Sequence, residues 1–282
     1  MLHIYGAGIS GLTTAFVAAT RGHKVCVYEQ AHIGAGASGQ ALGALVPSTL
    51  QRPIDTLQRQ GISQWPALAA ALAQHAQVPP GSLYRAWPAG GQLNLSQLFP
   101  AFEAALRNLG VTLQPPPAVS PPGPTLWATG WGVKDDIPHT TLSAGQVIRL
   151  ALPPALHGQI PLCKQGNVYL VPAWNGTTLL VGSKNTPTDT PITTPCPRAR
   201  AELRAAACAA YPALSEAPIV GEWVGNRPIS APRLPLIRPV ANRLHHVAVA
   251  GLGGIGFALA PVVAEAALTA LYHPEKATHP NR

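Results

Sequence analysis

The sequence predicts an α/β protein in which an antiparallel sheet is inserted into a nucleotide-binding fold. The first sign is an apolar strand, a glycine turn, a helix and a second strand within residues 2–29, the order of a parallel βαβ unit. The second is a change of pattern from Gly145 onward, where short apolar runs of strand length alternate with turn residues. With 282 residues, 47% of them hydrophobic, the chain can bury a large core.

The opening unit carries a dinucleotide-binding motif. We expect a buried strand at Leu2 to Tyr5, a tight loop at Gly6 to Gly11, a helix at Leu12 to Thr20 and a strand at Lys24 to Glu29. The loop reads G-x-G-x-x-G, a weak signal by itself. It follows a strand and opens a helix, and Glu29 comes at about the twenty-residue distance that the complete motif requires. The context therefore predicts a nucleotide site.

Each residue type in this motif has a physical role. Gly6 permits the turn, Gly8 lets a pyrophosphate approach the backbone, and Gly11 lets helix and strand pack closely. The helix N-terminus supplies N–H donors to the phosphates, and Glu29 accepts hydrogen bonds from ribose hydroxyls and disfavours a 2′-phosphate. The predicted contacts are Gly6, Gly8, Ile9, Ser10, Gly11, Glu29 and Gln30. FAD and NAD share the ADP half that this motif binds, so the motif alone leaves both open.

The remaining elements follow from hydrophobic periodicity. We predict helices at residues 54–77, 95–109, 198–211 and 257–272, and strands at 146–151, 167–173, 178–182, 219–225 and 246–251. Pro115 to Pro124 contains six prolines and should be an extended connector, and Thr186 to Pro197 should be a loop.

Charge and cysteines narrow the class of protein. The formal charge is +8, which favours anionic ligands or nucleic acid. The arginines are scattered rather than clustered, which disfavours nucleic acid as a partner. The four cysteines have no C-x-x-C spacing and share no ligand spacing with histidine. We therefore expect neither a metal site nor a disulfide framework, and a cytoplasmic location.

Two apolar stretches, residues 4–19 and 247–271, are broken by glycines. The second also contains Pro261 and Glu265 in a strand, turn and helix pattern. We expect both to be core segments and predict no membrane partner.

Six short motifs, in order, carry a resemblance to a known family. They are Gly36 to Ala44, Gly91-Gln92-Leu93, Ala128-Thr129-Gly130-Trp131, Val168 to Pro172, Arg227-Pro228 with Leu234 to Ile237, and Gly251 to Pro261. In these motifs the chain resembles the D-amino-acid oxidase and glycine oxidase family of FAD-dependent amine oxidases. The resemblance implies a Rossmann-like FAD-binding domain with an inserted, shortened antiparallel β-sheet substrate layer.

The resemblance also implies further FAD contacts. The loop from Ser38 would wrap the pyrophosphate and ribityl chain with its backbone amides. The glycine-rich segment after residue 250 would point a helix N-terminus at the flavin pyrimidine ring. The implied contacts are Ser38, Gly39, Gln40, Ala41, Gly43, Ala44, Gly130, Trp131, Gly253, Gly254, Ile255, Gly256 and Phe257. Gly251 to Gly256 also reads as a second G-x-G-x-x-G, but no third strand follows it to complete a second nucleotide unit.

Two residues match the family's catalytic positions. Arg227 matches the residue that grips the substrate carboxylate with its planar fork, and Tyr169 the aromatic that closes the site. The alternatives are a structural Arg227 paired with Glu222 or with a surface carboxylate, and a packing role for Tyr169. The implied reaction is oxidation of the C–N bond of an amino acid or secondary amine, with hydride transfer to flavin N5 and O2 as acceptor, giving H2O2.

The resemblance divides the chain discontinuously. Residues 1–50, 125–132 and 221–282 would form the FAD-binding domain, 78–95 and 145–220 the substrate layer, and 51–77 and 96–124 the helices and Pro-rich connector. The motifs around Ala44 to Pro47 also resemble the flavin domain of the bacterial tRNA wobble-uridine modification enzyme. A non-catalytic flavin-binding scaffold is a third possibility. The sequence predicts a small-molecule amine or amino acid substrate and leaves the oligomeric state open.

Overall fold

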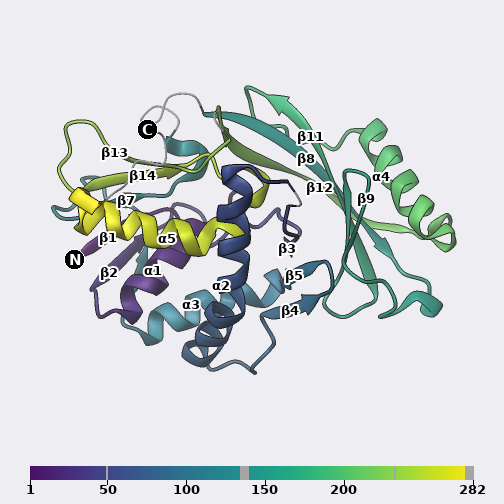
Figure 1. The fold of residues 1–282 in the computed structure, drawn as a ribbon, viewed down its shortest axis with the longest axis horizontal. Coiled ribbons are helices and arrows are strands. Elements are labelled where there is room, and N and C mark those ends of the chain that lie inside the picture. Colours follow the sequence, from purple (N-terminus) through teal and green to yellow (C-terminus); the bar gives the residue numbers. More distant parts are fainter. Residues whose placement is uncertain (49, 134–139, 232, 277–282) are drawn as a thin grey trace.

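The computed structural model describes residues 1–48, 50–133, 140–231 and 233–276. Within these residues, a mainly parallel sheet covered by helices occupies one side of the molecule, and a long antiparallel sheet occupies the other (Figure 1). This arrangement confirms the predicted α/β fold with an antiparallel layer. Residues 49, 232 and 277–282 of the predicted FAD-binding ranges lie outside the described residues.

The parallel sheet contains the predicted βαβ unit. Its strands, in spatial order, are β13 (Leu236–Pro239), β14 (His246–Ala250), β7 (Thr125–Trp127), β1 (Leu2–Tyr5), β2 (Val25–Tyr28) and β6 (Thr112–Gln114). β1 pairs in parallel with both β2 and β7, and only β13 runs antiparallel to its neighbour. The sheet therefore joins the first strand of the chain to the segments around residues 125 and 246.

Helices cover one face of this sheet. They are α1 (Ile9–Thr20), α2 (Pro53–Ala76), α3 (Leu95–Asn108) and α5 (Gly256–Tyr272). Their apolar faces and the inward residues of β1, β2 and β7 form the largest core, with Phe16, Trp65 and Phe102 almost fully buried. The indole N–H of Trp65 donates to the carbonyl oxygen of Phe257 at 2.7 Å, which links α2 to the first turn of α5.

The antiparallel sheet has the order β12, β8, β11, β10, β9. The strands are β8 (Thr140–Ala151), β9 (Cys163–Gln165), β10 (Val168–Pro172), β11 (Thr178–Thr188) and β12 (Ile219–Ser230). One face packs against α4 (Pro197–Ala210) through Ile148, Leu150 and Val181. By strand alternation, Val147, Tyr169 and Trp223 point to the other face.

A small third sheet is separate from the antiparallel sheet and includes residues 84–93 of the predicted substrate layer. β3 (Ala44–Leu45) pairs with β5 (Gly90–Leu93), which forms a hairpin with β4 (Tyr84–Trp87). Short 3-10 turns occur at Gly130–Val133, Pro154–Leu156, Pro212–Leu214, Gly253–Ile255 and Pro274–Lys276.

Three strands are longer than predicted. β8 begins at Thr140 rather than at residue 146, so the predicted start of the antiparallel layer at residue 145 falls inside this strand. β11 continues to Thr188, so the predicted loop from Thr186 was wrong at its start, and β12 continues past Gly225 to Ser230. Pro187 lies beyond the part of β11 that pairs with β10, and Pro228 lies on an edge strand. Each proline thus lies where one side of its strand has no partner, and a proline is tolerated there because that side forms no ladder hydrogen bonds. The predicted domain boundary at residue 221 falls inside β12.

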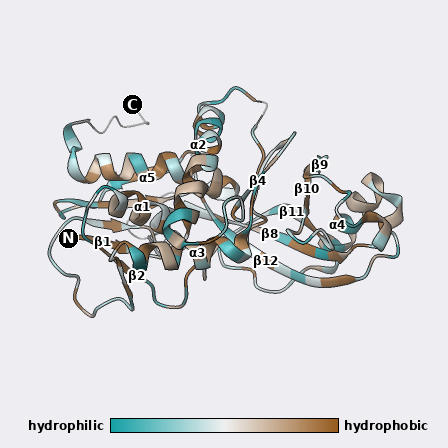
Figure 2. Cartoon of the chain, turned by 90° about the horizontal axis from the view of Figure 1, so that it is seen from below, coloured by the Kyte–Doolittle hydropathy of each residue, from teal (hydrophilic) through white to brown (hydrophobic). Residues whose placement is uncertain are grey.

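The apolar stretch near the C-terminus forms β14, a turn and α5, as predicted. The segment Gly253–Tyr272 is long and apolar enough to cross a membrane by length and composition alone, yet 56% of its apolar window is buried in the molecule. α5 packs against α1 and α2 (Figures 1 and 2), which accounts for its apolar surface. Figure 2 shows α4 at the opposite end from these helices.

Candidate active site

The glycine turn after β1 packs closely against the neighbouring backbone. Gly6 has φ +100°, a conformation that favours glycine, and a Cβ there would overlap the carbonyl oxygen of Ala128. A Cβ on Gly11 would overlap the carbonyl oxygen of Gly6. Both glycines therefore allow close packing of α1, the turn and the end of β7, and Gly130 lies two residues past Ala128 in the following turn.

The N-terminus of α1 fits a phosphate group. The N–H of Ile9 donates to Ser38 Oγ at 3.0 Å, and Gly8 leaves the space in front of that hydroxyl open, since a Cβ would come within 3.2 Å of it. The first turn, which includes Ser10, carries no acidic side chain. Backbone donors and positive dipole are thus available to an anion, and Ser38 is brought to this end of the helix as predicted.

Glu29 is held in place by the backbone. Its Oε2 accepts from the N–H of Ala7 at 2.9 Å, and its Oε1 accepts from the N–H of Ala31 at 3.0 Å. Each carboxylate oxygen keeps a further lone pair, as hydrogen bonds from ribose hydroxyls require. The side chain of Gln30 is exposed beside it.

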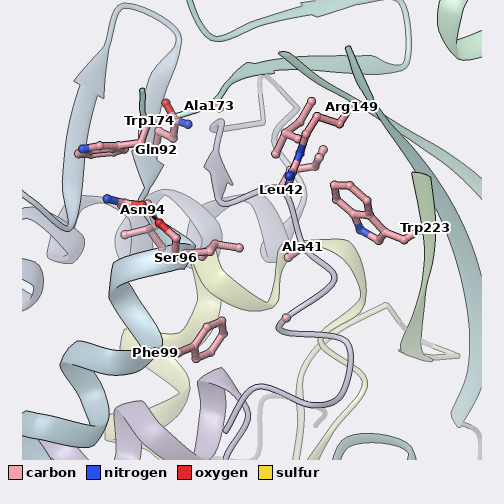
Figure 3. Close-up of a pocket in the computed structure, with 14 residues that line it drawn as sticks. Ala41, Leu42, Gln92, Asn94, Ser96, Phe99, Arg149, Ala173, Trp174 and Trp223 are labelled. Carbon is pink, nitrogen blue, oxygen red and sulfur yellow. Dashed lines mark hydrogen bonds between the residues drawn. The ribbon is translucent and has the colours of Figure 1, made fainter. Parts of the chain in front are cut away.

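The loop of residues 38–44 contacts the antiparallel sheet. The indole N–H of Trp223 donates to the carbonyl oxygen of Gln40 at 3.0 Å, and Gly225 leaves room for the Gln40 side chain. Gly39, Ala41 and Leu42 line a cavity of about 340 Å³ together with residues of β5, α3 and the sheet. Figure 3 shows Leu42 and Ala41 between Trp223 and Arg149 on one side and Gln92 and Asn94 on the other. The remaining loop residues, Gly43 and Ala44, lead into β3.

Arg149 adds positive charge to this cavity. Its guanidinium lies over the Trp223 ring, 5.4 Å from the ring centroid. The sequence motifs gave no reason to single out either residue.

The glycine segment before α5 lies next to Arg227. A Cβ on Gly254 would come within 3.6 Å of Arg227 Cδ, and Gly253 has φ +56°. Gly253, Gly254 and Ile255 form a 3-10 turn, and Gly256 begins α5. Phe257 differs from the other predicted contacts, because its ring packs in the core edge-on to Phe99.

The side chain of Arg227 crosses the face of the antiparallel sheet. Its Nη1 donates to Asn185 Oδ1 on β11, and burial lowers the pKa of the guanidinium. Burial also raises the pKa of the Tyr169 phenol, and the charge of nearby Arg227 partly opposes that rise. The two predicted catalytic residues therefore lie on the same face of the antiparallel sheet.

The alternative prediction that Arg227 pairs with Glu222 is wrong. Glu222 points to the opposite face of the sheet, where its Oε2 accepts from Arg200 Nε at 2.9 Å and its Oε1 accepts from Gln146 Nε2 at 2.6 Å. Since β12 alternates, residues 222 and 227 cannot meet on one face.

The comparison with protein families decides the identity. The family described as "FAD dependent oxidoreductase" (DAO) matches this chain over residues 2–121 and 122–270. The chain belongs to this family. The resemblance found in the motifs is thereby confirmed, and FAD is the cofactor of this FAD-dependent oxidoreductase. The turn at Gly6 and Gly8, the α1 N-terminus, Ser38 and Glu29 would hold its ADP half.

Known relatives cover nearly the whole chain. A Rhizobium etli protein that bears the name thiamine biosynthesis oxidoreductase ThiO is 28% identical, over 93% of each chain. Glycine oxidase from Geobacillus kaustophilus has a similar structure, with a TM-score of 0.80 at 20% identity, covering 99% of this chain and 95% of that one. Iminodiacetate oxidase from a Chelativorans species has a TM-score of 0.79 at 18% identity, covering 95% and 94%.

Sequence reasoning missed four residues of the site. One is Arg149, which lines the cavity described above. Trp223, Gly145 and Asn185 lie outside the recognised motifs, yet they contact Gln40 or Arg227. One signal was available for Gly145, since isolated glycines within strands often mark a close approach of another group.

Trp131, a predicted cofactor contact, is half-buried in the turn after β7.

Proposed function

We propose that this flavoenzyme oxidises the C–N bond of a small amino acid or a secondary amine that bears a carboxylate. The observation that carries the proposal is the position of Arg227, whose side chain lies against Gly254 at the α5 N-terminus and on the same sheet face as Tyr169. A carboxylate bound by Arg227 would lie between the FAD-binding segment and the antiparallel sheet. Its α carbon would then be close to the cofactor.

The residues of this chain would bind and orient the substrate. Arg227 would make two parallel charge-assisted hydrogen bonds to the carboxylate. Tyr169 would cover the substrate from β10, where burial keeps its phenol protonated at neutral pH. When bound, FAD supplies the hydride acceptor, and we propose dioxygen as the final electron acceptor, giving hydrogen peroxide.

The names of similar proteins support the substrate class. Glycine oxidase and iminodiacetate oxidase are named for small amines that carry carboxylates. Both substrates combine an amine nitrogen with a carboxylate on the neighbouring carbon, the arrangement that Arg227 would recognise.

The test compares wild type with Arg227→Lys. Peroxide formation is measured with glycine, with N-methylglycine and with benzylamine, which lacks a carboxylate. We expect kcat/KM for the two carboxylate substrates to fall about 100-fold in the variant, because an ammonium cannot reproduce the bidentate fork. Arg238→Lys, at an exposed position on β13, is the matched control. Equal rates for Arg227→Lys and wild type on both carboxylate substrates would contradict the proposal.

A further inference from the structure

Two residues outside the recognised motifs surround the guanidinium of Arg227. Gly145 on β8 and Asn185 on β11 lie directly opposite each other in the antiparallel register. Arg227 comes from β12, where it is paired with Ser143 of β8. Its side chain runs diagonally across β8, so three strands meet at this one cation.

Gly145 makes the space that the guanidinium fills. A Cβ at this position would overlap Nη1, Nη2 and Cζ of Arg227. The backbone of Gly145 gives no other reason for glycine, since its φ is not in the left-handed region and it lies within a strand. Glycine is unfavourable inside strands, so a close approach of another group is the physical reason for its presence.

Asn185 holds the guanidinium from the far side of Gly145. Its Oδ1 accepts a hydrogen bond from Arg227 Nη1. The amide is neutral, so it orients the guanidinium without cancelling the charge. A carboxylate at this position would pair with the cation and compete with an anionic ligand.

We propose that Gly145 and Asn185 are positioning residues that set the direction of the Arg227 fork toward a ligand carboxylate. The proposal rests on the proposed function, because it assigns a purpose to the carboxylate role of Arg227. It adds that the orientation of Arg227 depends on the missing side chain of Gly145 on β8 and on the side-chain amide of Asn185 on β11.

The test measures binding, so it does not depend on knowing the substrate. The probes are benzoate, a carboxylate without an amine, and benzamide, its neutral counterpart of similar shape. Each is titrated into FAD-loaded protein, and the change in flavin absorbance gives the Kd. Wild type should bind benzoate more tightly than benzamide.

Gly145→Ala is the decisive variant. Alanine suits a strand, and the atoms it displaces are at the far end of a flexible side chain, so the fold should persist. We expect the Kd for benzoate to rise about tenfold while that for benzamide stays unchanged. The matched control is Gly221→Ala on β12, where a Cβ would make an ordinary contact of 3.6 Å with Arg149 Cβ. It should leave both Kd values unchanged.

Asn185 variants give a second readout in case Gly145→Ala does not fold. Asn185→Asp should weaken benzoate binding more than Asn185→Ala, because an aspartate at this position would add a negative charge beside Arg227 and an alanine would not. Suppose that wild type binds benzoate more tightly than benzamide, but Gly145→Ala binds benzoate as wild type does. The positioning role alone is then wrong. If Gly145→Ala cannot be purified, the same conclusion follows when both Asn185 variants bind benzoate as wild type does. If wild type does not discriminate at all, the carboxylate role of Arg227 fails, and the proposed function and this inference fail together.

Discussion

At the residue scale, Glu29 is the most sharply defined cofactor contact. Both of its oxygens accept backbone hydrogen bonds, which orients the carboxylate before any ligand arrives. Glu29→Ala should raise the Kd of FAD about tenfold to 100-fold, because charged hydrogen bonds contribute about 1.5–3 kcal/mol each. Fluorescence titration of apoprotein with FAD measures this. Glu103→Ala, at a partly exposed residue of α3, is the control, and a Glu29→Ala Kd within twofold of wild type would refute the ribose role.

Asp55 predicts a pH dependence at the same scale. It accepts hydrogen bonds from the backbone N–H and the guanidinium of Arg52, and that guanidinium holds the pKa of the Asp55 carboxyl far below its usual range. A lowered folded-state pKa stabilises the fold above the unfolded-state pKa of about 3.9, and this stability is lost as the pH falls through the folded-state value. Asp55→Asn should therefore lower Tm at pH 7. Thermal melts should show the difference shrinking below about pH 4, and a constant difference would contradict this origin.

At the element scale, the crossing of α2 and α5 depends on Gly61. A Cβ there would overlap the carbonyl oxygen of Ala258 in the first turn of α5. Helix propensity alone predicts that Gly61→Ala gains about 0.5–1 kcal/mol, whereas the crossing predicts a loss. We expect a clear fall in Tm by calorimetry, with Ser63→Ala on the exposed side of α2 as control. A rise in Tm would show that the helices do not approach so closely.

Elements also show where sequence reasoning succeeds and fails. The βαβ unit is local, so the glycines, the apolar runs and Glu29 specify it within thirty or so residues of chain. The ends of β11 and β12 were missed because the predicted strands stop at Gly182 and Gly225, where the apolar pattern ends, whereas pairing with β8 extends both strands further. Arg227 was found through the family resemblance alone. Gly145 and Asn185 were not found, because their contacts depend on the register of three distant strands.

At the scale of the whole molecule, the loop around Gln40 connects the glycine turn at the N-terminus of α1 with the antiparallel sheet. Trp223 anchors that loop through its indole N–H. Trp223→Phe removes this donor and keeps an aromatic ring, so the Kd of FAD should rise about threefold to tenfold, as one neutral hydrogen bond allows. The same FAD titration measures this, and Trp87→Phe, which loses an indole bond in the β4–β5 hairpin, is the control. Equal effects of the two variants would mean that the anchor is not specific to the loop.

We propose that the parallel and antiparallel sheets together form the site of an amine-oxidising flavoenzyme. The most direct measurement is the flavin absorbance of the purified protein on anaerobic addition of amino acids and secondary amines. We expect glycine, N-methylglycine or a related amine with a carboxylate to bleach the oxidised flavin bands, and air to restore them with formation of peroxide. Bands that persist with every such amine would contradict it.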